Sequence, residues 1–119
     1  MSDKFYITTP IFYVNDKPHI GHAFTMIASD VLARYHRLAG QEVFFLTGTD
    51  EHGVKIVKAA EKAGLEPQIF TDAVSEKFRE LTGILNLSND YLIRTTDREI
   101  HWPGVFKIWK ILQENGDLY

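Results

Sequence analysis

Hydrophobic and polar positions along the chain predict strands that alternate with helices. β-Branched and aromatic side chains fill residues 5–9, and short apolar runs follow at 43–47 and 91–95. The run at 43–47 is continuously apolar, which is typical of a strand buried on both faces of a parallel sheet with helices on either side. The alternation predicts an α/β fold with a parallel sheet, and three strands supply half of a doubly wound domain.

The longest helical pattern begins near Gly21 and ends at Gly40. Polar residues Asp30, Arg34 and Arg37 take one face of this predicted helix. The opposite face is apolar, and it consists of Phe24, Ile27, Ala28, Val31, Leu32 and Tyr35.

Further helices are predicted at 54–63, with Gly64 as the stop, and at 67–85, with Pro67 as the first helical residue. A turn and then a main helix from about Pro103 complete the pattern. This last helix is apolar on almost all sides, which predicts burial on more than one side. Residues 117–119 resemble the start of another strand.

Composition narrows the class of protein. The chain has 119 residues, a net charge of -3 and no cysteine. The charge excludes nucleic-acid binding by a basic surface of this chain alone. The absence of cysteine excludes disulfides, thiolate zinc sites and cysteine nucleophiles, and it agrees with a reducing cytoplasm, where we expect the protein. No signal peptide or membrane-spanning run is visible, so no membrane partner is expected.

The chemistry centres on His19-Ile20-Gly21-His22, at a predicted turn from strand to helix. A helix N-terminus with two imidazole donors suits an anion such as a nucleotide phosphate. Gly21 has no Cβ, so a flat base can lie against the backbone there. The alternatives are structural histidines, or metal ligation that lacks an obvious third ligand.

A second polar stretch, residues 48–53, follows the predicted central strand, where open α/β sheets bind their ligands. Asp50 can accept a hydrogen bond from a substrate ammonium group, or it can cap the next helix. We expect Glu51 to be solvated and His52 to be a loop residue. Tyr13, close to His19 in sequence, can line a small pocket. Neither a Walker lysine loop nor a dinucleotide glycine motif is present.

These stretches are similar to a known family. Residues 8–15, 19–22 and 45–53 closely resemble the N-terminal part of bacterial methionyl-tRNA synthetases, and so do 93–97 and 116–119. The histidine motif is shared by all class I aminoacyl-tRNA synthetases, and a looser form occurs in cytidylyltransferases. The block at 47–53 is much more specific. The resemblance covers essentially the whole chain and implies a Rossmann-like nucleotide-binding catalytic domain with a parallel sheet and flanking helices.

The resemblance also implies roles for individual residues. His19 and His22 would be catalytic and contact the phosphates of ATP. The remaining ATP-binding residues would be Thr8, Asn15 and Gly21. Methionine would be bound by Ile11, Tyr13 and Asp50, with the Tyr13 hydroxyl near the thioether sulfur and Asp50 on the α-amino group.

In the family reaction, the methionine carboxylate attacks the α-phosphate of ATP, which is used with Mg²⁺. Methionyl-adenylate and pyrophosphate form, and the methionyl group then passes to tRNA(Met). The family's lysine-rich loop, its connective insertion with a zinc knuckle, the second half of the nucleotide fold and the anticodon-binding domain have no counterpart in residues 1–119. The resemblance therefore implies a truncated N-terminal piece, weak or inactive by itself.

Two other functions stay open. A small cytidylyltransferase would use the same histidine turn, and its usual length suits this chain. The other is non-catalytic, either a stand-alone module that binds amino acids or partner proteins or an inert fragment.

Overall fold

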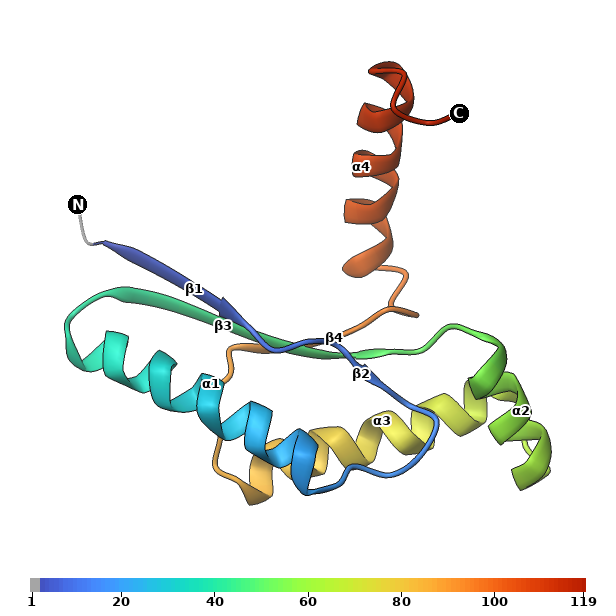
Figure 1. The fold of residues 1–119 in the computed structure, drawn as a ribbon, viewed down its shortest axis with the longest axis horizontal. Coiled ribbons are helices and arrows are strands. Elements are labelled where there is room, and N and C mark those ends of the chain that lie inside the picture. Colours follow the sequence, from blue (N-terminus) through green and yellow to red (C-terminus); the bar gives the residue numbers. More distant parts are fainter. Residues whose placement is uncertain (1–2) are drawn as a thin grey trace.

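The computed structural model describes residues 3–119 as a parallel four-stranded sheet with helices packed mainly on one face (Figure 1). Its elements are β1 (Lys4–Thr8), β2 (Phe12–Tyr13), α1 (Ile20–Leu38), β3 (Glu42–Asp50), α2 (Val54–Ala63), α3 (Pro67–Ile84), β4 (Tyr91–Arg94) and α4 (His101–Glu114). The predicted parallel α/β sheet is confirmed.

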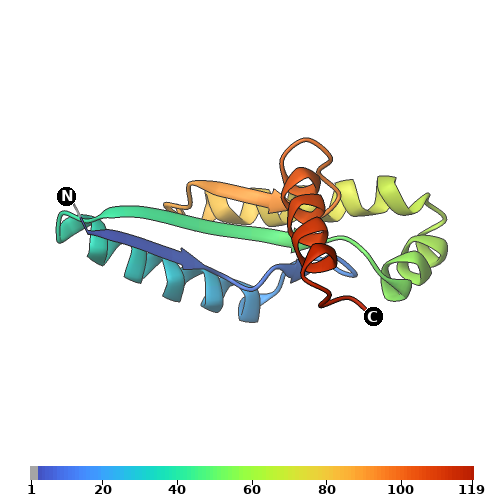
Figure 2. The same ribbon diagram turned by 90° about the horizontal axis from the view of Figure 1, so that it is seen from above.

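Strand β3 is the centre of the sheet, because every other strand pairs with it in parallel. Figure 2 shows β1 and β2 along one edge of β3 and β4 along the other. Strand β2 was not predicted, since two residues are too few for an alternation pattern. Pro10, which has no N–H to donate, separates β2 from β1.

Strand β3 is longer than the apolar run that predicts it. Gly48, Thr49 and Asp50 belong to the strand rather than to a loop, because β2 and β4 extend the ladder to them. The prediction that both faces are buried is wrong for Phe44, which is 48% exposed. Helices α1, α2 and α3 lie on the other face of the sheet (Figure 1).

The core lies between the sheet and those three helices. Its buried side chains are Phe12, Val14, Met26, Ile56, Val74 and Phe78. Phe12 stacks on Phe78 with ring centroids 5.5 Å apart, which joins β2 to α3.

Helix α1 packs on the sheet with a side that includes the polar residue Asp30. Its buried residues are Met26, Asp30 and Ala33. Asp30 is buried because its carboxylate accepts hydrogen bonds from the Ser88 N–H (2.7 Å), the Ser88 hydroxyl (2.6 Å) and Arg34 Nε (2.6 Å). An apolar stripe therefore faces outward along α1, and it consists of Ile20, Phe24, Ile27, Val31, Tyr35 and Leu38.

The predicted helices at 54–63 and from Pro67 are confirmed. Helix α4 stands away from the sheet and none of its residues is buried, so nothing among residues 3–119 covers its apolar sides (Figure 1). Residues 117–119 form no strand, because no strand within the described residues pairs with them; the Asp117 N–H donates instead to the Leu112 carbonyl oxygen of the preceding helix (3.0 Å). No helix between residues 3 and 119 is long and apolar enough to cross a membrane.

Candidate functional site

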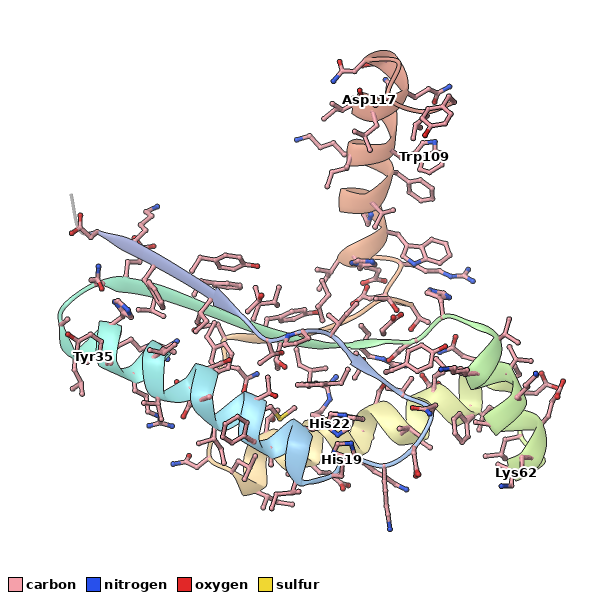
Figure 3. All side chains as sticks on the ribbon, viewed as in Figure 1. His19, His22, Tyr35, Lys62, Trp109 and Asp117 are labelled. Carbon is pink, nitrogen blue, oxygen red and sulfur yellow. The ribbon has the colours of Figure 1, made fainter. Side chains whose placement is uncertain are left out.

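The two histidines cap the start of α1 reciprocally. His19 Nδ1 accepts a hydrogen bond from the Gly21 N–H (3.1 Å), and His22 Nδ1 accepts one from the His19 N–H (3.1 Å). The rings stack with centroids 3.9 Å apart (Figure 3). Because each Nδ1 is an acceptor, a neutral ring carries its proton on Nε2. Neither Nε2 donates to any residue within 3–119, so both N–H groups are available to a ligand.

Gly21 is required by the ring of His19. A Cβ at this position would lie 2.9 Å from His19 Cε1 and 3.0 Å from Nδ1, which is closer than real side chains approach. A larger residue would push the imidazole out of its capping position. The glycine therefore permits the ring geometry itself, in addition to any room it leaves for a base.

His22 links the turn to the core. Its ring meets Phe12 and Phe78 edge-on, at centroid distances of 5.1 Å in both cases. Burial lowers the pKa of His22, and the neighbouring His19 lowers this pKa further. His22 is therefore neutral at pH 7, and its neutral form has the donor on Nε2 that the capping geometry requires.

A cavity of about 400 Å³ opens in front of this turn. It brings together four predicted site residues, and its lining consists of Tyr13, Asn15, Asp16, Lys17, Pro18, His19 and His22. The glycine of the motif, Gly21, lies directly behind the ring of His19.

The other predicted site residues lie outside this cavity. Thr8 is the exposed last residue of β1. Ile11 lies beside β3, with its Cγ2 atom 3.3 Å from the Cβ position of Gly48. Asp50 ends β3 opposite Tyr13 in the strand register. All three residues are thus at or near the carboxyl edge of the sheet, where a ligand larger than the cavity would extend.

The Asp50 carboxylate is not a helix cap. The N-cap of α2 is Gly53, and no side chain caps that helix, so this structural alternative is wrong. Among residues 3–119, no group donates a hydrogen bond to the Asp50 carboxylate or pairs with it. A half-buried, unpaired carboxylate at the sheet edge is suited to a cationic ligand group.

Tyr13 is held close to Gly53. A Cβ on Gly53 would overlap the Tyr13 hydroxyl oxygen, and the backbone there has φ +129°, which L side chains rarely adopt. The aromatic ring packs partly against the core, while the hydroxyl lies over the loop that follows Asp50.

Glu51 is buried, so the prediction that it is solvated is wrong. Only 4% of the residue is exposed. Its carboxylate accepts hydrogen bonds from Arg94 Nε (2.7 Å), Arg94 NH2 (3.0 Å) and the Thr49 hydroxyl (2.9 Å), and also from Ser75 and Thr96. Burial raises the pKa of Glu51, but these hydrogen bonds outweigh burial and hold it below its usual value. Glu51 is therefore ionised at neutral pH.

A smaller cavity, about 250 Å³, lies at the base of α4. His52 lines it, with Thr95, His101, Trp102, Val105 and Phe106. Trp102 is half-buried and donates a hydrogen bond from Nε1 to the Thr95 carbonyl oxygen (3.0 Å). Trp109 is 57% exposed and points out from α4 (Figure 3).

Comparison with known proteins places this arrangement in a family. The sequence model described as "tRNA synthetases class I (M)" matches residues 5–119. The chain belongs to this family of class I tRNA synthetases. A methionine--tRNA ligase of Rickettsia felis is 56% identical to this synthetase chain over 119 residues, which are 100% of the chain and 23% of the relative. A Thermotoga maritima methionine--tRNA ligase is 56% identical over 116 residues, which are 98% of the chain and 18% of the relative.

Comparison with solved structures also finds a methionyl-tRNA synthetase. The Mycobacterium tuberculosis methionyl-tRNA synthetase in complex with methionyl-adenylate matches with a TM-score of 0.94 and 42% identity, over 98% of the synthetase chain and 23% of the solved chain. The match confirms the expected Rossmann-like fold. The chain spans about a fifth of the length of the curated relatives it matches.

Sequence reasoning missed one buried ion pair next to the candidate site residue Asp50, the Glu51–Arg94 pair. A signal for it exists in the sequence. Glu51 follows β3 and Arg94 ends β4, and the carboxyl ends of parallel strands meet at one edge of the sheet. A charged residue at each end therefore predicts that the two can pair.

Proposed function

We propose that residues 1–119 are the N-terminal part of the catalytic domain of a methionine–tRNA ligase and form half of its active site. One observation carries the proposal. Two imidazoles with unused Nε2–H donors face a cavity near the carboxyl edge of a Rossmann-like sheet, and the unpaired Asp50 carboxylate lies outside this cavity at the end of the central strand. The similarity to a synthetase solved with methionyl-adenylate supports the choice of ligand.

In this proposal the two histidines donate from Nε2 to phosphate oxygens of ATP. Donors that are already in place where negative charge grows lower the barrier without any proton transfer. Thr8, Asn15 and Gly21 flank the nucleotide. Mg²⁺ accompanies the ATP as its counter-ion, and we assign no residue of this chain to it.

The amino acid occupies the side nearer β3. Asp50 accepts hydrogen bonds from the α-ammonium group, while Ile11 and Tyr13 contact the thioether side chain. A carboxylate oxygen of methionine then attacks the α-phosphorus of ATP, the bond to the bridging oxygen breaks and pyrophosphate leaves. The substrate supplies the nucleophile, so the protein contributes orientation and electrostatic stabilisation. The methionyl group then passes to tRNA(Met) on the complete enzyme, in the cytoplasm.

The proposal is tested in a chimera. Residues 1–119 replace the matching residues of the Rickettsia felis ligase, which are 56% identical. Methionine-dependent exchange between ATP and pyrophosphate is measured with a panel of amino acids, for the chimera and for the isolated chain. We expect exchange by the chimera with methionine only, and little or none by the isolated chain.

Asp50→Ala should lower kcat/KM for methionine by about 100-fold, because a charged hydrogen bond contributes about 1.5–3 kcal/mol. Glu61→Ala, an exposed acid on α2, is the matched control and should have no effect. Unchanged activation by Asp50→Ala would refute the role of that residue. Release of pyrophosphate that depends on CTP would instead favour a cytidylyltransferase.

A further inference from the structure

The end of β3 is anchored on both sides of Asp50. The Thr49 hydroxyl is fully buried and donates to Glu51 Oε1 (2.9 Å), and the Ser75 hydroxyl of α3 lies 3.3 Å from Thr49 Oγ1 and donates to it. Glu51 is also held by Ser75. Side chains alternate across a strand, so fixing residues 49 and 51 toward α3 directs Asp50 to the opposite face of the sheet.

The same anchor ties β3 to the end of β4. The Glu51 N–H donates to the Thr95 hydroxyl (2.8 Å), and the Thr95 N–H donates to the Thr49 carbonyl oxygen (3.2 Å). His52 Nε2 lies 3.3 Å from the Thr95 carbonyl oxygen and can donate to it. The residues on either side of Asp50 are thus joined to one buried network that includes β4.

Glu51 also neutralises the positive charge of Arg94. Arg94 contacts Glu51 through two nitrogens and also pairs with Asp72 of α3. These carboxylates raise the pKa of Arg94, so its positive charge is permanent. Arg94 ends β4 beside Thr49, which directly precedes Asp50. Without Glu51, this guanidinium would keep only the exposed Asp72 carboxylate as its partner and would be an incompletely neutralised cation at the end of β4.

We propose that Glu51 is a positioning residue, which neutralises Arg94 and holds the Asp50 carboxylate toward the ammonium group of the amino-acid substrate. This inference rests on the proposed function, because it assumes that Asp50 binds an ammonium group. Glu51 itself touches no substrate, since it is buried among Thr49, Ser75, Arg94 and Thr96.

The test separates binding of the ammonium group from binding of the rest of the substrate. Dissociation constants of the chimera are measured by calorimetry for L-methionine and for 4-(methylthio)butanoate, which lacks only the amine. The ratio of the dissociation constant for 4-(methylthio)butanoate to that for L-methionine reports the contribution of the ammonium group. Glu51→Gln should lower this ratio by about tenfold, because small displacements of a binding group are costly. Loss of general structure would weaken both ligands equally and leave the ratio unchanged.

Two further variants sharpen the result. Asp50→Asn sets the lowest ratio, and Glu51→Gln added to it should lower the ratio no further, since both changes remove one contact. Asp72→Asn is the matched control, because it takes the exposed partner from Arg94 but leaves Glu51 in place. It should change the ratio by less than about twofold.

Thermal unfolding of each variant shows whether it is folded. If Glu51→Gln does not fold, Ser75→Ala removes one hydrogen bond to Glu51 and should lower the ratio by about threefold. An unchanged ratio in a folded Glu51→Gln chimera, or an additive effect with Asp50→Asn, would overturn the positioning role. A parent chimera without methionine-dependent exchange would overturn the proposed function instead.

Discussion

Removing the Asp30 carboxylate should destabilise the isolated chain by about 3 kcal/mol. Asp30 is 7% exposed and joins the middle of α1 to the loop before β4. Its oxygens accept hydrogen bonds from the Ser88 N–H (2.7 Å), the Ser88 hydroxyl (2.6 Å) and Arg34 Nε (2.6 Å). Asp30→Ala leaves these donors without their acceptor.

The size of the expected destabilisation depends on how exposed each hydrogen bond to Asp30 is. Hydrogen bonds to a charged group contribute about 1.5–3 kcal/mol each, and the two bonds from Ser88 are of this kind. The Arg34 side chain is 46% exposed, so its pair with Asp30 adds only about 0.5 kcal/mol. Loss of all three bonds is less than additive, which gives about 3 kcal/mol. Domains are stable by only about 5–15 kcal/mol, so the change is large.

The assay is urea unfolding of the chain, followed by far-UV circular dichroism. Tryptophan fluorescence would report poorly, because both tryptophans are on α4, which has no buried residue. Glu114→Ala is the control. It removes an exposed pair with Lys110 (3.7 Å) and should cost less than about 0.5 kcal/mol. A parent chain without a cooperative transition would favour an inert fragment.

The pH dependence of unfolding provides a second test of the role of Asp30. Burial raises its pKa, but hydrogen bonds from Ser88 and Arg34 outweigh burial and keep the pKa below its usual value. The carboxylate therefore stabilises the fold above about pH 4, and this contribution disappears as the pH falls through the lowered pKa. The deficit of Asp30→Ala should shrink at acid pH. A loss below about 1 kcal/mol at neutral pH would refute the reasoning.

Two other changes have defined outcomes. Gly53→Ala should lower methionine activation by the chimera by about tenfold, because the added Cβ overlaps the Tyr13 hydroxyl. Adding Tyr13→Phe removes that hydroxyl and should restore part of the lost activity. If Tyr13→Phe restores none of it, the contact between the two residues does not explain the loss. The free energy of unfolding of the chain should fall as the pH drops below about 6.5, because the lowered pKa of His22 lets the unfolded state bind a proton first. His22→Asn should reduce that slope in urea unfolding at pH 7 and pH 5.5, and an unchanged slope would assign the proton to another group.

Local patterns predicted most elements of this fold. Helix α2 begins and ends where the sequence indicates, and Pro67 is the first residue of α3, because glycine and proline act through their own backbone. The location of the histidine turn at a strand-to-helix boundary was equally predictable. Whether its residues bind the proposed ligands is still a prediction.

The side on which α1 packs could not be predicted. Apolar spacing identifies a stripe but not its partner, and here the buried side holds Asp30. That burial depends on Ser88, which lies far along the chain. The pairing of Glu51 with Arg94 had a sequence signal, a charged residue at the end of each of two strands, but that signal becomes specific only once β4 is known to lie beside β3. Charged residues are rarely buried unless they are paired, and the pairing is tertiary information.

The central position of β3 has a consequence for the order in which the chain folds. Its pairings join residue 4 to residue 42 and residue 46 to residue 91, and the described strands form no hairpin. Each pairing must close a long loop, and sheets built from such contacts form slowly. During synthesis, β1 and α1 leave the ribosome before the strand with which β1 pairs. The earliest structure available to the nascent chain is therefore helical, and the sheet assembles around β3 afterwards.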